Sequence, residues 1–259
     1  MPFADLANVR LHYALSGDNS RPPLILSNSL GTNFSMWDAQ APIFEKSFRL
    51  LRYDVRGHGQ SSVPPAPYSV PELAADVLSL ADFLRIERFH FCGLSVGGMI
   101  GMSIALQSPA RLRKLVLCST APKIGTLESW NTRIETVRTQ GMKEIARTTP
   151  ARWFTPDFQS RAPEAVAATL RIVESLNPEG YVGGCCAVRD FDACTTVSGI
   201  RVPTLVLSGT HDPAATPSDG RFLADRIPGA CYAELNASHI SCIEDSTRFT
   251  TEVMSFLAG

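Results

Sequence analysis

A serine set between glycines is the residue with the clearest chemical potential in this chain. Ser95 lies in the sequence Gly93-Leu94-Ser95-Val96-Gly97. The run 88–92 before it predicts a short buried strand, and residues 99–107 after it predict a helix. A serine on the sharp turn between a strand and a helix presents its hydroxyl at the positive end of the helix dipole. The pattern predicts that Ser95 is a catalytic nucleophile.

A serine hydroxyl attacks a carbonyl only when a base removes its proton. The chain has five histidines. His12 and His90 fall in strand patterns, His58 precedes the serine in a loop, and His211 directly precedes an aspartate. His239 follows the last predicted strand and a short loop. Because this strand-turn-helix arrangement places its residues in the chain order serine, acid, histidine, we expect His239 to be the base.

The acid that orients such a histidine should follow the strand predicted at 204–208. Asp212 lies in the turn directly after that strand, in Gly209-Thr210-His211-Asp212. Asp190 and Asp192 also lie between Ser95 and His239 in the chain, but they fall in a different, helical segment. We therefore expect Asp212 to complete the triad.

The reaction also needs hydrogen-bond donors for the oxyanion that develops on the carbonyl. One donor is expected to be the backbone N–H of Val96, the residue after the nucleophile. The other should come from residues 27–32, which follow an early strand, and Leu30 occupies the expected position.

Alternating strands and helices must position these residues. The predicted strands are 11–15, 24–27, 49–54, 89–92 and 114–118, with helices at 70–86 and 99–107. After residue 203 the predicted alternation resumes, with strands 204–208 and 231–235 and helices 218–227 and 243–257. This order predicts an α/β fold with a mainly parallel, doubly wound sheet.

The segment between these two series has a different pattern. It contains predicted helices at 128–139, 142–147, 163–176 and 179–188 and no convincing strand. Such an insertion should lie over the carboxyl ends of the strands, where sheets of this type bind their ligands. We expect residues 1–121 and 198–259 to form the core and residues 122–197 to form a helical lid.

Composition excludes several other classes of protein. A net charge of −1 in 259 residues gives no footprint for nucleic acid or an anionic membrane. The amino terminus lacks a signal-peptide pattern and the most apolar run is interrupted by glycines, so a cytoplasmic protein without a membrane span is expected.

Seven cysteines without a C-x-x-C pair argue against disulfides or zinc. Cys92 and Cys118 are expected in the core, and a nucleophilic role for Cys185-Cys186 is a weaker alternative.

Several longer stretches extend this pattern and resemble the α/β-hydrolase superfamily, more narrowly the bacterial 3-oxoadipate enol-lactonases. The matching stretches are residues 26–32, Met36-Trp37, 52–59, 91–95, Arg152-Trp153-Phe154-Thr155, 208–212 and 237–241. The Arg-Gly-His-Gly and serine motifs are widespread in the superfamily, whereas Ser-Asn-Ser-Leu-Gly and Arg-Trp-Phe-Thr are narrower.

The resemblance implies hydrolysis of 3-oxoadipate enol-lactone to 3-oxoadipate through an acyl-enzyme, without metal or cofactor. Because this small-molecule lactone carries a free carboxylate, a lid cation should bind it. The candidates are Arg133, Arg152 and Arg189, with Trp130 or Trp153 as a packing wall. Alternatives that share the triad are another esterase or lactonase, a cofactor-free haloperoxidase-like enzyme and a carbon–carbon hydrolase. A non-hydrolytic ligand receptor on the same fold is an alternative of another class.

Overall fold

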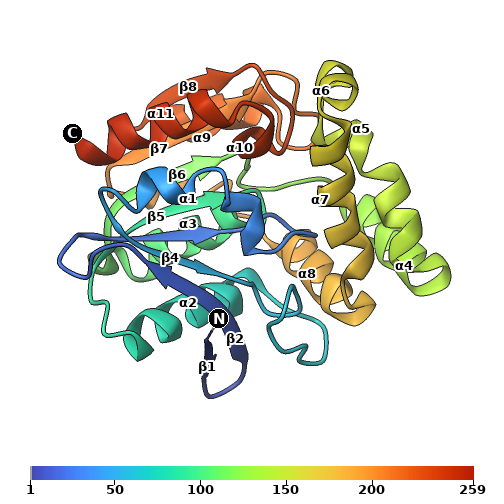
Figure 1. The fold of residues 1–259 in the computed structure, drawn as a ribbon, viewed down its shortest axis with the longest axis horizontal. Helices are drawn as coiled ribbons and strands as arrows, with labels where there is room; N and C mark the ends of the chain where they lie inside the picture. The colour runs from blue at the N-terminus through green and yellow to red at the C-terminus, as the bar shows by residue number, and fades with distance from the viewer. Residues whose placement is uncertain (1) are drawn as a thin grey trace.

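An eight-stranded sheet organises the computed structural model, which describes residues 2–259 (Figure 1). The strands are β1 (Phe3–Asp5), β2 (Arg10–Ser16), β3 (Pro23–Ser27), β4 (Arg49–Tyr53), β5 (Phe89–Leu94), β6 (Leu112–Cys118), β7 (Thr204–Gly209) and β8 (Cys231–Leu235). Their order is β1-β2-β4-β3-β5-β6-β7-β8. The pairs from β4 to β8 are parallel, whereas β2 is antiparallel to both β1 and β4. The predicted, mainly parallel sheet is confirmed; the antiparallel edge was not predicted.

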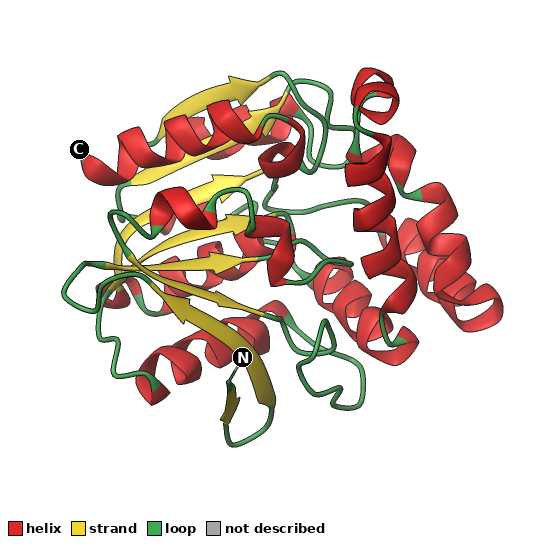
Figure 2. Ribbon diagram, viewed as in Figure 1, coloured by secondary structure: helices red, strands yellow, loops and turns green. Residues whose placement is uncertain are grey.

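Helices cover both faces of this sheet (Figures 1 and 2). On one face lie α1 (Ala41–Phe44), α10 (Ser241–Glu244) and α11 (Ser246–Ala258), and on the other lie α2 (Val70–Phe83), α3 (Val96–Gln107) and α9 (Pro217–Arg226). Three short 3-10 turns occupy Phe34–Trp37, Pro109–Arg111 and Val197–Gly199. The interior strands β5 and β7 are buried along their whole length, as expected for a sheet with both faces covered.

The insertion between β6 and β7 is helical, as predicted. It contains α4 (Leu127–Thr148), α5 (Pro150–Trp153), α6 (Pro156–Arg161), α7 (Pro163–Ser175) and α8 (Pro178–Asp190). Figure 1 shows these helices gathered beyond the arrowheads of the parallel strands. The carboxyl ends of the strands, where Ser95, Asp212 and His239 follow β5, β7 and β8, therefore face the inserted helices.

Some element boundaries differ from the predicted ones. The helix predicted to begin at 99 begins at Val96, directly after the serine. The helices predicted at 128–139 and 142–147 form α4, which is interrupted by non-helical backbone at Gly141. The predicted helix 243–257 is divided at Asp245 into α10 and α11. The short helices α5 and α6, of four and six residues, were not predicted because they are too short to show a helical period.

Residue 1 of the predicted core lies outside the described residues. Within residues 2–259, no helix is both long enough and apolar enough to cross a membrane.

Candidate active site

Ser95 lies on a strained turn between β5 and α3. Its backbone has φ 59° and ψ −117°, a left-handed conformation that costs free energy for a residue with a side chain. The turn is possible because its neighbours are glycines: a Cβ on Gly97 would lie 2.2 Å from the carbonyl oxygen of Ser27. The Ser95 N–H donates to the Cys118 carbonyl on β6, and its own carbonyl accepts from the Thr120 hydroxyl. These contacts fix the turn and leave the Ser95 side chain directed into a cavity.

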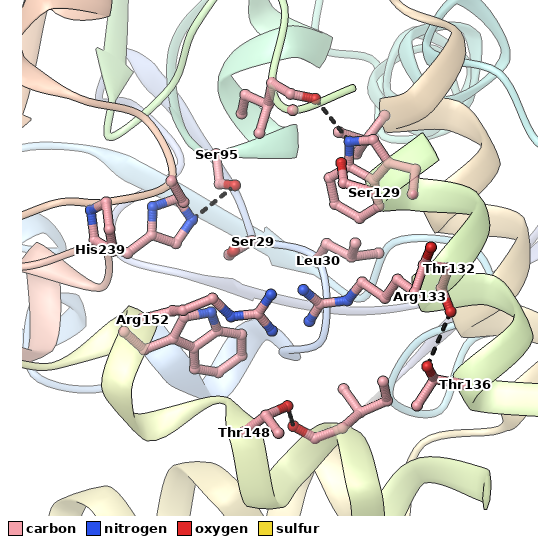
Figure 3. A pocket seen from close by; sticks show the side chains of 18 of the residues that line it. Ser29, Leu30, Ser95, Ser129, Thr132, Arg133, Thr136, Thr148, Arg152 and His239 are labelled. Carbon is pink, nitrogen blue, oxygen red and sulfur yellow. Dashed lines mark hydrogen bonds between the residues drawn. The ribbon is translucent and has the colours of Figure 1, made fainter. Parts of the chain in front are cut away.

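A continuous hydrogen-bond relay joins the three predicted triad residues. The Ser95 Oγ lies 3.0 Å from Nε2 of His239, and Nδ1 of the same ring lies 2.8 Å from Oδ2 of Asp212 (Figure 3 shows the serine–histidine contact). An ionised carboxylate can only accept, so Nδ1 carries the proton and Nε2 is left to accept the serine proton. This is the geometry that a nucleophile, base and orienting acid require.

Backbone amides fix the Asp212 carboxylate. Its Oδ1 accepts hydrogen bonds from the N–H groups of Ala214 and Ala215, at 2.8 and 3.0 Å. The carboxylate is buried, so its orientation toward His239 is set by these contacts and not by solvent. Asp190 and Asp192, the two alternatives, bind Arg189 and Lys123 instead.

The two predicted oxyanion donors come from two segments, the first residue of α3 and the loop that follows β3. Val96 is the first residue of α3, so its N–H has no acceptor within the helix. Leu30 lines the cavity beside Ser95, in the loop that follows β3. Among residues 2–259, neither the Leu30 nor the Val96 N–H has a hydrogen-bond acceptor. Both amides are therefore available to a substrate oxygen.

A cavity of about 440 Å³ opens over Ser95 and His239. Its wall includes four of the five predicted substrate-binding residues, namely Trp130, Arg133, Arg152 and Trp153. Figure 3 shows the side chains of Arg133 and Arg152 extending toward each other across the cavity. The site therefore combines Ser95 at one side with two cations from the helical insertion.

The two arginines differ in how they are held. Arg133 donates from Nε to the Tyr181 hydroxyl at 2.7 Å and packs against the rings of Trp130 and Tyr181. Arg152 has no salt-bridge partner among the described residues. Burial, with the nearby Arg133 charge, lowers its pKa to about 10, so it is a cation at neutral pH.

Arg189 does not belong to this group. Its guanidinium makes two hydrogen bonds to the Asp190 carboxylate and one to Asn131, and it does not line the cavity. The adjacent pairing in the sequence, Arg189-Asp190, was the signal that could have excluded it. Cys185 is buried in α8, and burial raises the pKa of its thiol to about 12. A nucleophilic thiolate there is not supported by this environment.

Two features of the site escaped prediction. Glu244 accepts hydrogen bonds from the Ser238 N–H, at 2.8 Å, and from the N–H and hydroxyl of Thr155. The Ile240 N–H donates to the Trp153 carbonyl at 3.1 Å, and the Ser238 hydroxyl lies 3.2 Å from the Arg152 carbonyl. The segment 152–155 is thus bound to the loop that carries His239. No sequence signal joins residues more than eighty positions apart.

The second unpredicted feature is the role of His58. Its ring contacts the loop that carries Leu30, with Nε2 lying 3.1 Å from the Gly31 nitrogen. The position of His58 before the serine excluded it as the base but gave no indication of this contact.

Comparison with known proteins shows the family to which this fold belongs. A model of the alpha/beta hydrolase fold family matches residues 22–152. The 3-oxoadipate enol-lactonase 2 of Acinetobacter baylyi is 41% identical over 95% of this chain and 92% of that protein. The chain belongs to the 3-oxoadipate enol-lactonase family of α/β hydrolases. Another enol-lactonase of that organism, 3-oxoadipate enol-lactonase 1, is 33% identical over 92% of this chain and 90% of its own length.

A solved member of the enol-lactonase family has the same fold over its full length. The crystal structure of the enol-lactonase from Burkholderia xenovorans LB400 matches with a TM-score of 0.98 and 45% identity, covering 100% of both chains. The predicted α/β-hydrolase fold and the predicted carboxylic ester hydrolase class are confirmed.

Proposed function

We propose that this protein hydrolyses 3-oxoadipate enol-lactone to 3-oxoadipate, with Ser95, His239 and Asp212 as its catalytic triad. The observation that carries the proposal is the unbroken relay from Asp212 through His239 to Ser95, which opens on a cavity walled by Arg133 and Arg152. The enol-lactonase relatives at 41% and 45% identity support the choice of substrate.

The chemistry begins with attack of the Ser95 oxygen on the lactone carbonyl, while Nε2 of His239 takes the serine proton. The amides of Leu30 and Val96 stabilise the oxyanion, and the Asp212 carboxylate stabilises the imidazolium. Collapse of the intermediate breaks the ring C–O bond. The ring oxygen leaves as an enolate. A proton is then added at carbon, equivalent to the one that His239 took from Ser95, so that the enolate becomes the ketone and His239 is neutral again.

Water completes the cycle. His239 removes a proton from a water molecule as the water attacks the acyl-enzyme carbonyl, and it then returns that proton to the Ser95 oxygen. The products are free serine and the second carboxylate of 3-oxoadipate, so one lactone and one water are consumed for each keto acid formed.

The substrate's own carboxylate would be held by Arg133 and Arg152, with Trp130 and Trp153 packing against the ring. Two guanidinium groups that face the same cavity suit an anion, because hydrogen bonds between charged groups are stronger than neutral ones. We further propose that residues 122–197, which supply these side chains, form a lid domain on the core formed by 1–121 and 198–259.

The test is a comparison of two substrates by steady-state kinetics. Loss of the lactone's ultraviolet absorbance, with lactone generated in situ, is compared with hydrolysis of an aryl acetate. We expect kcat/KM for the lactone to reach the usual enzymatic range of about 10⁴–10⁸ M⁻¹s⁻¹ and to exceed that for the ester by far. Activity on the ester alone would support the triad but contradict the proposed substrate. Inactivity on both substrates, with slow labelling by a covalent serine probe, would favour the alternative of a non-hydrolytic ligand receptor.

The nucleophile is tested by Ser95→Ala, which should lower kcat by at least about 10³-fold because no other group can form the acyl-enzyme. Ser255→Ala, at an exposed position of α11, is the control and should keep full activity. Retention of most activity in Ser95→Ala would exclude the proposed mechanism.

A further inference from the structure

Residues 29–32, in the loop after β3, have four backbone N–H groups in succession. Three of these groups already donate hydrogen bonds within the protein. The Ser29 N–H donates to Sδ of Met36, at 3.4 Å, and the Thr32 N–H donates to the Ser29 carbonyl, at 3.2 Å. The Gly31 N–H donates to Nε2 of His58, at 3.1 Å. Of these four, only the Leu30 N–H has no acceptor within residues 2–259. Residues 29–32 therefore offer one donor to the cavity, and His58 binds the N–H next to it.

The hydrogen bonds of His58 define a single neutral tautomer. Because the Gly31 N–H can only donate, Nε2 must be unprotonated and accept. Nδ1 then carries the proton and faces the Arg56 carbonyl, at 3.2 Å. The ring is buried, and burial lowers its pKa, which favours the neutral form.

Packing holds the ring in place from the side of α8. A Cβ on Gly184 would lie 3.2 Å from Cε1 of His58 and 2.5 Å from Cδ1 of Leu30, so a side chain larger than hydrogen would displace both. The Tyr181 ring of the same helix lies 6.5 Å from the His58 ring, centroid to centroid. His58 thus lies between α8 and the loop, to which its hydrogen bond with Gly31 joins it.

We infer that His58 is a positioning residue, which holds the Gly31 N–H so that the preceding Leu30 N–H points at the substrate oxyanion. Gly31 adopts φ 89°, a conformation open to glycine, and without an anchor such a residue has other conformations available. Loss of the Nε2 acceptor would leave Gly31 N–H unpaired and free to compete for the cavity. The inference rests on the proposed function, since it assumes that Leu30 N–H is an oxyanion donor.

Two substitutions distinguish the role of Nε2 from that of Nδ1 in the His58 ring. In His58→Gln the side-chain amide oxygen can reach the position of Nε2 and accept from Gly31. In His58→Asn the shorter amide retains polarity near Nδ1 but has no atom at Nε2. We expect His58→Asn to lower kcat by about 10²–10³-fold, as removal of one oxyanion donor does, and His58→Gln to recover at least about tenfold of that loss. His90→Asn, at a buried histidine remote from the cavity, is the control and should keep its kcat.

A binding measurement distinguishes positioning from general damage. An arylboronic acid forms a tetrahedral adduct with Ser95 whose oxygen occupies the oxyanion site, whereas adipate offers only carboxylates. In His58→Asn the inhibition constant of the boronic acid should rise in parallel with the loss of kcat/KM, and that of adipate should stay within about threefold. Equal weakening of both, or equal kcat in His58→Asn and wild type, would overturn the inference. Absence of hydrolysis by the wild-type protein would instead reject the proposed function.

Discussion

Arg152 is a cation that has no salt-bridge partner among residues 2–259. Its guanidinium is partly buried in the cavity wall, no carboxylate among the described residues pairs with it, and Arg133 lies near enough to lower its pKa further. Burying an unpaired charge is costly, so such an arrangement is expected where a ligand supplies the missing anion. The same reasoning explains why Arg189, which is satisfied by Asp190, does not take this role.

Substitution of Arg152 should therefore act on substrate affinity. We expect Arg152→Ala to raise KM for the lactone by about 10–100-fold, because a hydrogen bond to a charged group contributes about 1.5–3 kcal/mol, with kcat changed much less. Steady-state kinetics against the lactone and the neutral aryl acetate provide the measurement. KM for the acetate should hardly change.

Arg189→Ala is the matched control, since it removes another lid arginine outside the cavity. It should leave both KM values as they are. An unchanged lactone KM in Arg152→Ala would assign the substrate carboxylate to other groups.

At the scale of residues, the site residues that directly follow a strand could be predicted from the sequence. Ser95, Asp212 and His239 each follow a recognisable strand, so their meeting at one edge of the sheet could be expected. The adjacent Asp190 could have excluded Arg189. That Arg133 and Arg152 both line the cavity could not be predicted, because it depends on how helices of the insertion pack. His58 escaped for the same reason: its partner, Gly31, is distant in sequence and the contact is to a backbone amide.

Glu244 joins two elements that are far apart in the chain. Its carboxylate on α10 receives the Ser238 N–H from the His239 loop and both donors of Thr155 from the start of α6. These donors are all satisfied by one buried, acceptor-only group. The position of His239 and that of the Arg152 segment are therefore set together.

Replacement of this carboxylate should loosen both elements. We expect Glu244→Gln to lower the free energy of unfolding by about 1–3 kcal/mol, because one amide oxygen cannot satisfy three donors and the new NH₂ faces them. A fall in kcat should accompany it. Urea unfolding and steady-state kinetics on the same samples provide the measurements.

The control for this change is Glu252→Gln, at a half-buried position of α11, where the carboxylate lies 3.6 Å from Nε of Arg248. A surface pair of this kind contributes about 0–1 kcal/mol, so little stability should be lost. If Glu244→Gln were as stable and as active as Glu252→Gln, the link between the elements would have no energetic importance.

Elements with a clear period were predicted better than those without one. The strand 204–208 and the helix 163–176 agree with β7 and α7 within one residue. In contrast, α5 and α6 are short turns of helix whose position depends on their contacts with Glu244 and the His239 loop. The antiparallel β1 has three residues, too few for an alternation to be visible.

At the scale of the whole molecule, buried neutral histidines make stability depend on pH. His90 is 7% exposed, its Nδ1 has no hydrogen-bond partner within residues 2–259, and burial with the charges of Arg113 and Lys114 lowers its pKa to about 4. The pKa of an unfolded histidine is about 6.5. Between these values the unfolded chain binds a proton that the folded protein does not, so stability falls as pH decreases.

The contribution of His90 can be isolated by substitution. From pH 7.5 to pH 5.0 the wild-type free energy of unfolding should fall, and that of His90→Asn should fall less, because the asparagine cannot titrate. Urea unfolding of both proteins at the two pH values measures how much less the free energy of unfolding falls in His90→Asn than in the wild type. An equal fall in both proteins would show that other groups, such as the buried His58, account for the acid sensitivity.

The attachment of segment 152–155 has a consequence for how substrate preference can change. Two of its hydrogen bonds use the backbone carbonyls of Arg152 and Trp153, while the side chains of these same residues line the cavity. A carbonyl is common to every amino acid, so mutation at either position alters the wall without detaching it from the catalytic loop. Mutational libraries confined to these two positions should therefore change substrate preference while keeping both hydrogen bonds to the loop that carries His239.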